Sequence, residues 1–370
     1  MEIRTPQGTR DLTGQDVIKK RSLEKKVQDV FERYCFEEVM TPAFEYYQTY
    51  NAAFSSLEDR AMVKFFDEMG DILTLRMDMT VPIARLAAQQ FQNAPLPLRF
   101  SYSSSVYKVK KSFAGKMNEV TDTGVELIGL NEIGDLEILC CAVDTLKALE
   151  MEDYTLELGD VNFFGRAAKK VFANEEDMER AADLIDRKSM VELEEFLQEK
   201  QLDPKAAAFF MELPLLNGGA EVLKKARQIS FDPSLDEVID RLEHLYSAME
   251  ELGDSEGITF DLGALPHIHY YTGLIFAGFV KGVGSSVLSG GRYDSLLSRF
   301  GRDLPAVGFS VKLDYLLDQV QTPKKTTRTR ILYPENRAVE AFAAAKEARV
   351  KGPVEMVVWD REEIVEENCI

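Results

Sequence analysis

Cysteine, histidine and tryptophan are scarce in this chain of 370 residues, which contains four, three and one of them. The cysteines are unevenly spaced, and three histidines cannot complete a zinc-binding pattern with them, so we expect neither disulfide bonds nor a metal site. Long apolar runs are also missing. No stretch approaches the roughly 18 consecutive apolar residues of a membrane span, and the first residues show no signal-like segment. We therefore expect a cytoplasmic protein that does not associate with membranes.

Positive charge is in short supply as well. The chain has 44 lysines and arginines against 63 aspartates and glutamates, a net charge of −19. Nucleic-acid binding normally requires a basic surface, which so large a negative charge opposes. One basic group, Lys108 with Lys110 and Lys111, lies where a ligand would be expected. It is consistent with solvated charges or with contacts to an anion.

The composition is otherwise that of a globular protein, with 45% hydrophobic and 29% charged residues. The length exceeds the roughly 250–300 residues at which a single core stops growing. Hydrophobic periodicity predicts a helix over 17–34, a long antiparallel hairpin over 98–109 and 119–130, and a helical insertion over about 164–252. Strands are also expected at 36–43, 72–76, 154–158, 258–262, 274–280 and 287–289, and a helix at 310–317. This pattern indicates an α+β fold on a mainly antiparallel sheet.

A boundary is expected at the lysine-containing segment 323–327. Beyond it, residues 331–333, 339–349 and 354–359 have the pattern of one β-α-β unit, which is too small to form a complete domain alone. We therefore expect a core of residues 1–322, carrying the insertion, and a small unit of residues 328–370.

Five short motifs follow one another along the chain. Their order is more specific to one protein family than any single motif is. They occupy residues 5–11, 41–45, 75–80, 270–273 and 290–294. Together they resemble histidyl-tRNA synthetase, a class II aminoacyl-tRNA synthetase. Residues 75–80 (Leu-Arg-Met-Asp-Met-Thr) are closer still to the regulatory subunit of ATP phosphoribosyltransferase, a synthetase-like family of histidine biosynthesis. The resemblance implies a synthetase-like antiparallel sheet with flanking helices, and makes the last unit the remnant of an anticodon-binding-like domain.

The arginines that this resemblance requires for adenylation are missing. Joining a carboxylate to ATP builds negative charge on phosphate oxygens, which arginine stabilises with its planar, bidentate fork. The chain has Lys108, Pro266 and Tyr315 at the three arginine positions, and Lys110 where a glutamate would bind adenine. The third class motif, Gly-Leu-Glu-Arg in the family, is Lys-Leu-Asp-Tyr at 312–315. Losing one charge-stabilising group costs ~10²–10³ in rate, so we expect no catalysis.

The amino-acid pocket implied by the resemblance is better preserved. Two of its residues match positions that hold the ligand's ammonium group, Asp78 and Thr80. Glu126 matches the acid that binds the imidazole, with Tyr271 beside it, whereas Asp122 replaces a glutamine. Carboxylates opposite the cationic and donor groups suit histidine. The candidate histidine-binding residues are Asp78, Thr80, Asp122, Glu126, Tyr270 and Tyr271.

Residues 266–271 also have simpler explanations. They read as a strand, so Tyr270 and Tyr271 should point to opposite faces and only one should line the pocket. The resemblance selects Tyr271. His267 and His269 share one face, but lone histidines are more typical of structural groups than of ligands.

Two other segments leave alternatives open. The glycine-rich stretch 290–294 is equally consistent with a turn packed under the sheet, and its Arg292 with an ion pair to an acidic neighbour. Lys116 and Asn118 replace two arginines of a family loop, which weakens the expectation of histidine binding.

The resemblance implies a non-catalytic regulatory subunit of ATP phosphoribosyltransferase. In that family, the subunit pairs as homodimers with a short catalytic subunit in a hetero-octamer, supports its activity and transmits feedback inhibition by L-histidine. We expect no cofactor and no tRNA partner. A divergent or truncated histidyl-tRNA synthetase is the alternative, but it would need the missing arginines. A synthetase-like RNA-sensing module is a third reading, which the acidic charge disfavours.

Overall fold

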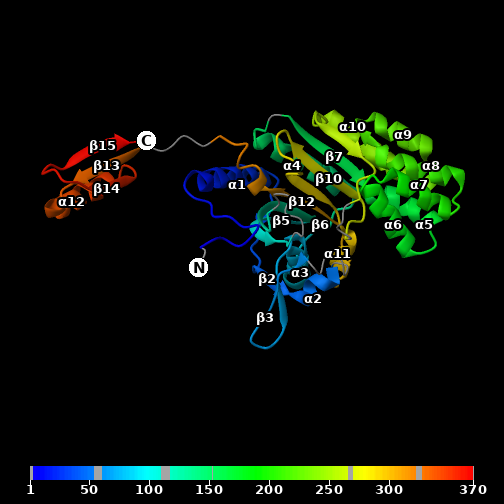
Figure 1. Ribbon diagram of the computed structural model, residues 1–370, viewed down its shortest axis with the longest axis horizontal. Helices are drawn as coiled ribbons and strands as arrows, with labels where there is room; N and C mark the ends of the chain where they lie inside the picture. Colours follow the sequence, from blue (N-terminus) through cyan, green and yellow to red (C-terminus); the bar gives the residue numbers. More distant parts are fainter. Residues whose placement is uncertain are drawn as a thin grey trace. The chain divides into compact units, whose positions relative to one another are not determined.

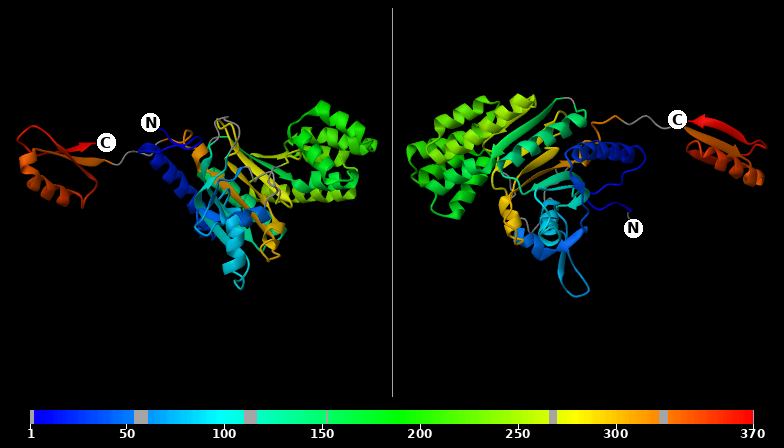
Figure 2. Two further views of the ribbon diagram at one scale, coloured as in Figure 1. Left: turned by 60° about the horizontal axis from the view of Figure 1, so that its bottom comes forward. Right: turned by 180° about the vertical axis from the view of Figure 1, so that it is seen from behind.

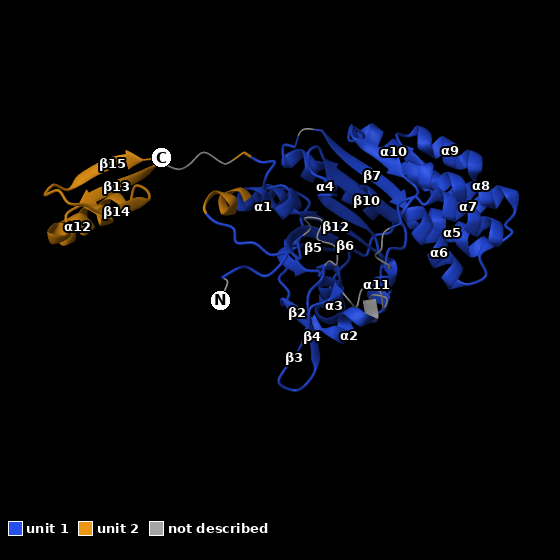
Figure 3. Cartoon of the chain, in the orientation of Figure 1, with its two compact units in different colours: residues 1–13, 20–320 blue, residues 14–19, 321–370 orange. Residues whose placement is uncertain are grey.

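The structure, a computed structural model, describes residues 3–53, 61–109, 117–151, 153–265, 270–321 and 327–369. The chain forms two compact units, Met1–Thr13 with Lys20–Val320 and Gly14–Lys19 with Gln321–Ile370 (Figure 3). Each has a hydrophobic core of its own. Across the described ranges, no helix combines the length and the apolar character that crossing a membrane requires.

A nine-stranded sheet forms the centre of the larger unit (Figure 1). Its strand order is β1-β5-β6-β12-β11-β10-β7-β9-β8, and all neighbours are antiparallel except the pairs β1–β5 and β7–β9. The predicted α+β fold on a mainly antiparallel sheet is confirmed. The strands are β1 (Glu37–Glu38), β5 (Leu98–Tyr107), β6 (Glu119–Ile128), β7 (Tyr154–Asp160), β8 (Asn217–Gly218), β9 (Ile258–Asp261), β10 (Leu274–Val280), β11 (Leu288–Arg292) and β12 (Ala306–Lys312).

The two faces of this sheet pack against different helices. On one face, Val125 and Leu127 of β6 share a core with α1 (Gln15–Arg33) and α4 (Glu132–Ala148). On the other, Phe100 of β5 packs with α2, α3 and α11. Because side chains alternate along a strand, the even-numbered residues of β6 belong to this second face. The second group of helices is α2 (Tyr47–Ala53), α3 (Thr80–Gln90) and α11 (Asp294–Ser298).

Six α-helices between β7 and β9 form the expected helical insertion. Figure 2 shows them gathered as one bundle beside the sheet. Buried phenylalanines form much of their core, among them Phe163, Phe209 and Phe210. The helices are α5 (Val161–Val171), α6 (Glu175–Asp186), α7 (Met190–Glu199), α8 (Pro204–Glu212), α9 (Glu221–Ile229) and α10 (Pro233–Leu252).

The smaller unit contains a three-stranded sheet and one helix. β13 (Arg328–Tyr333), α12 (Ala338–Ala348) and β14 (Val354–Val358) make the expected β-α-β unit, in which the strands are parallel. A third strand, β15 (Val365–Cys369), pairs antiparallel with β13 and was not predicted. Its central residues, Glu366, Glu367 and Asn368, are polar and exposed, so they give no apolar alternation that would mark a strand.

Two predicted elements around the sheet are wrong. Residues 310–317 are not a helix: the segment begins inside β12 and continues as a 3₁₀ turn, Leu313–Tyr315. Apolar residues alternate with glycine and polar residues along β12, a period of two that indicates a strand. The strand expected at 36–43 is reduced to Glu37–Glu38. Proline cannot donate to a strand ladder, which is consistent with the interruption around Pro42.

After this interruption the chain forms a second, smaller sheet, in the order β2-β4-β3. Its strands are β2 (Phe44–Tyr46), β3 (Lys64–Phe66) and β4 (Ile72–Leu75), all antiparallel. The loop from β4 to α3 carries the motif at residues 75–80 onto the face of the main sheet that packs against α2, α3 and α11.

Arg76 anchors this loop. Its buried guanidinium donates from Nε to the carbonyl of Ser105 (2.7 Å) and from Nη1 to the carbonyls of Thr41 (2.8 Å) and Pro42 (3.3 Å). Its own carbonyl accepts from the amide of Tyr107 (2.8 Å). One side chain therefore fixes the loop to the end of β5 and to the segment before β2.

Replacing Arg76 with methionine should lower the thermal midpoint of the protein by roughly 5–10 °C, because three carbonyls lose their donor. Differential scanning calorimetry would measure the change. Arg33→Met, at an exposed arginine on the last turn of α1, is the matched control and should shift the midpoint by less than about 2 °C. Equal midpoints for Arg76→Met and the parent protein would contradict the anchoring role.

Candidate functional site

A cavity of about 280 Å³ lies on the sheet face that α1 and α4 do not cover. The six residues that the sequence analysis proposes for histidine all line it. The expectation that only one of Tyr270 and Tyr271 lines the cavity is wrong. They lie in a turn and loop before β10, not in a strand, so the alternation rule does not apply.

Glu126 of β6 lines this cavity and is buried, with 1% of its surface exposed. Its Oε1 accepts a hydrogen bond from Thr80 Oγ1 (2.8 Å), and its Oε2 accepts one from the hydroxyl of Tyr293. Burial raises the pKa of Glu126 to about 8, although both hydrogen bonds oppose the shift. The carboxyl group is therefore mostly protonated at pH 7, and a donor or cation placed beside it would favour its ionised form.

Asp78 lines the cavity from the segment just before α3. Its Oδ1 accepts from the amide of Val81 (3.0 Å), and its carbonyl accepts from the hydroxyl of Tyr50 (3.0 Å). That hydroxyl in turn accepts from the amide of Met77 (3.1 Å). Tyr50 is fully buried, so it holds the backbone on both sides of the Asp78 Cα in a fixed position.

Tyrosines make up much of the remaining wall. The rings of Tyr270 and Tyr271 meet edge to face at 5.2 Å, and Tyr270 meets Tyr293 at 5.9 Å. Burial, with the nearby carboxylates Glu126 and Asp78 adding to it, raises the pKa of Tyr270 and Tyr271 above the usual tyrosine range. These phenols are therefore neutral at physiological pH.

Glycines give the backbone of β11 and β12 the space that this wall needs. A Cβ at Gly308, which is paired with Glu126, would overlap the Glu126 carboxylate and the carbonyl of Val125. A Cβ at Gly291 would lie 2.7 Å from the ring of Tyr271. Glycine is thus required where the sheet meets the two groups that the resemblance assigns to the imidazole.

The cationic residues of the lining are Lys108 and Lys312, and no arginine appears among its described members. Tyr315, at the position of the expected third-motif arginine, also lines the cavity. The neighbouring Asp314 has a structural function. Its Oδ2 accepts from the amide of Thr121 (2.6 Å), and its Oδ1 accepts from Lys20 Nζ (3.0 Å), which joins α1 to the sheet.

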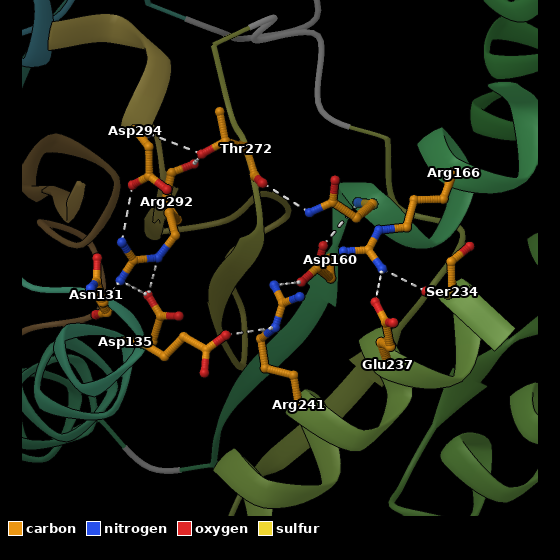
Figure 4. Close-up of polar contacts among 12 residues, drawn as sticks. Asn131, Asp135, Asp160, Arg166, Ser234, Glu237, Arg241, Thr272, Arg292 and Asp294 are labelled. Carbon is orange, nitrogen blue, oxygen red and sulfur yellow. Dashed lines mark hydrogen bonds and ion pairs between the residues drawn. The ribbon is translucent and has the colours of Figure 1, made fainter. Parts of the chain in front are cut away.

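Arg292 does not line the cavity, which agrees with the ion-pair explanation. Its Nε donates to Asp135 Oδ1 (2.8 Å) and its Nη1 to Asp294 Oδ1 (3.0 Å) (Figure 4). Asp135 is buried, which raises its pKa to about 6 against the lowering effect of Arg292. The carbonyl of Arg292 also accepts from the amide of Thr272 (2.7 Å) and thereby holds the loop after Tyr271.

The same loop is bound to the helical insertion. The carbonyl of Thr272 accepts from Asn162 Nδ2 on α5 (2.8 Å), and the amide of Asn162 donates to Asp160 Oδ1 (2.8 Å). Arg241 of α10 donates to the other oxygen of Asp160 (3.2 Å). Thr272 is therefore the residue at which the sheet, the insertion and the cavity wall meet.

Several residues that the sequence analysis named lie outside the described residues. They are Lys110, Lys111, Lys116, Pro266, His267 and His269. The lining also contains residues that were not proposed for the site, among them Tyr102, Tyr293 and Lys312. Tyr102 follows the period-two alternation of β5, and Tyr293 lies in the glycine-rich motif, so a signal existed for both. Lys312 was not proposed because residues 310–317 were wrongly predicted as a helix.

Comparisons with known proteins agree with the motifs. Residues 8–316 match the family model for histidyl-tRNA synthetase. The ATP phosphoribosyltransferase regulatory subunit of Thermoanaerobacter sp. (strain X514) is 37% identical over 373 residues, which cover 99% of this chain and 97% of that protein.

Two solved structures extend the comparison to the fold. One, described as an ATP phosphoribosyltransferase regulatory subunit/histidyl-tRNA synthetase from Bacillus halodurans, has a TM-score of 0.85 at 30% identity and covers 97% of this chain and 93% of its own. Histidyl-tRNA synthetase from Nostoc sp. PCC 7120 has a TM-score of 0.76 at 17% identity, with 98% of this chain and 87% of its own covered, and shows the shared fold alone. The chain therefore belongs to the family of ATP phosphoribosyltransferase regulatory subunits, which are built on the histidyl-tRNA synthetase fold.

Proposed function

We propose that this chain activates a short ATP phosphoribosyltransferase catalytic subunit in the cytoplasm, and that it binds L-histidine and transmits feedback inhibition without catalysing a reaction itself. The single observation that carries the proposal is the composition of the cavity. Carboxylates and phenols suited to histidine line it, and the described lining lacks the arginines that adenylation needs. The printed names of the relatives support a catalytic subunit of ATP phosphoribosyltransferase as the partner.

Histidine would fit this cavity with its imidazole against Glu126. An imidazole N–H would donate to the carboxylate, beside Tyr271, while the ammonium group would approach Asp78 and Thr80. For histidine to inhibit, it must bind one conformation of the complex more tightly than the other. Thr272 directly follows Tyr271 of the cavity wall and is bound to the insertion, so it is a physical route for such a change.

Mixing the protein with its cognate short catalytic subunit should produce phosphoribosyltransferase activity that neither partner shows alone, and histidine should inhibit it. The same preparation should show no histidine-dependent exchange of pyrophosphate into ATP. Failure to activate the cognate subunit would refute the regulatory function. Measurable exchange would instead favour a divergent histidyl-tRNA synthetase.

Histidine affinity should depend on pH with a maximum between about 6.5 and 8. Free imidazole has a pKa near 6.5, and the pKa of the buried Glu126 is about 8. The bound pair shares one proton, so binding must release a proton below this window and take one up above it. Affinity should therefore fall on each side by up to about tenfold per pH unit. Calorimetry in buffers of different ionisation enthalpy would measure the affinity at each pH and the number of protons released or taken up on binding.

Glu126→Gln provides the matched test of this assignment. It should weaken histidine binding by roughly 10–100-fold, the contribution of a charge-assisted hydrogen bond, and remove the alkaline decrease in affinity. Glu251→Gln, at an exposed position on α10, should leave the histidine affinity and its alkaline decrease unchanged. Unaltered affinity in the Glu126 variant would place the histidine site elsewhere.

We also propose that the regulatory subunit is a homodimer that pairs through the small sheet β2-β4-β3. Large apolar side chains are exposed there, with Phe44 at 51%, Tyr46 at 56% and Phe66 at 72%. Patches of this kind on a globular protein are typical of protein interfaces.

Phe66→Asp should convert the dimer to a monomer in sedimentation velocity, because a charge would be buried at the interface. Phe342→Asp, at an equally apolar residue of α12 that is 51% exposed, is the matched control and should remain dimeric. A dimeric Phe66 variant, or a monomeric parent protein, would exclude this interface.

A further inference from the structure

The cavity changes in charge from one end to the other. Antiparallel pairing of β6 and β12 places Gly308 opposite Glu126, and Lys312 opposite Asp122. Alternate residues of a strand share a face, so Ser310 and Lys312 follow Gly308 along the same side of the cavity. At about 3.3 Å per residue, the Lys312 end lies some 13 Å from the Glu126 end.

A second lysine lies at the same end. Lys108 follows β5, four residues beyond Ser104, which pairs with Asp122. The amide of Lys108 donates to the carbonyl of Asn118 (2.8 Å), which extends the β5–β6 hairpin in the direction away from Glu126. Lys312 is half-buried, and its Nζ donates to Ser289 Oγ on β11 (3.4 Å). Both lysines line the cavity.

This arrangement matters for an amino-acid ligand because its α-carboxylate must lie away from Glu126. Asp122 is 9% exposed and occupies that end, where it would repel a second carboxylate unless cations stand beside it. A lysine ammonium is a compact charge on a flexible stem, so it can satisfy a protein carboxylate and a ligand carboxylate together.

We propose that Lys312, supported by Lys108, binds the α-carboxylate of the ligand and makes the cavity specific for an amino acid over the corresponding amine. The inference rests on the proposed histidine site and adds the group that recognises the other end of the ligand. Asp122, which is opposite Lys312 on the neighbouring strand, orients the ammonium group of Lys312. The histidyl-tRNA synthetase motif has glycine at position 312, so this contact has no counterpart in that motif.

Calorimetric titration of the full-length protein with L-histidine and with histamine, which lacks the carboxylate, tests the proposal. The parent protein should bind histidine roughly 10–100-fold more tightly than histamine. Lys312→Met should lose most of this preference by weakening histidine binding, with histamine binding unchanged. Lys312→Arg should restore much of it, and Lys205→Met, at an exposed lysine of α8, should behave like the parent protein.

The two ligands separate the possible failures. If the parent protein binds histidine and Lys312→Met binds it equally well, Lys312 only neutralises Asp122 and the proposal is overturned while the histidine site stands. If Lys312→Met weakens histidine and histamine alike, the substitution disturbs the whole cavity and the carboxylate assignment is also overturned. If the parent protein binds neither ligand, the proposed histidine site itself fails and this inference fails with it.

Discussion

The arrangement of the cavity depends on how the buried carboxyl group of Glu126 is accommodated in the centre of the sheet. Its desolvation raises its pKa to about 8, and Thr80 and Tyr293 offset part of that cost by donating to its two oxygens. Both donors come from segments far away in sequence, at the start of α3 and after β11. Glycine at position 308 is the condition for this arrangement, since any side chain there would overlap the carboxylate.

The arginines near the cavity mainly hold the structure together. Arg292 clamps Asp135 and Asp294, Arg76 fixes the loop before α3, and Arg85 pairs with the buried Glu45 through Nε at 2.9 Å. Their guanidinium groups are committed to protein partners. At the cavity itself the cations are lysines, which bind a carboxylate as point charges but do not reproduce a bidentate phosphate clamp. The chemistry of the cavity therefore matches binding of an amino acid better than activation of one.

Much of the architecture could be predicted from the sequence because its patterns are local. The β5–β6 hairpin shows a clear alternation, and the insertion shows helical periodicity over a long stretch. The six candidate residues were found through motifs, and all of them line one cavity. The helix predicted at 310–317 covers the last three residues of β12 and the 3₁₀ turn after it, and this error left Lys312 out of the candidate site. The turn at residues 270 and 271 was read as a strand, since two adjacent tyrosines give no local sign of a bend.

The most direct test of the account is a crystal structure of the complex of this protein, its catalytic subunit and L-histidine. We expect the imidazole of histidine to donate to Glu126 beside Tyr271 and its ammonium group to lie near Asp78. The carboxylate of histidine should point along β12 toward Lys312. Histidine bound at a contact with the catalytic subunit, with water alone between these residues, would contradict the account. The cavity would then be an inherited feature of the synthetase fold, and the regulatory site would have to be sought at the contact between subunits.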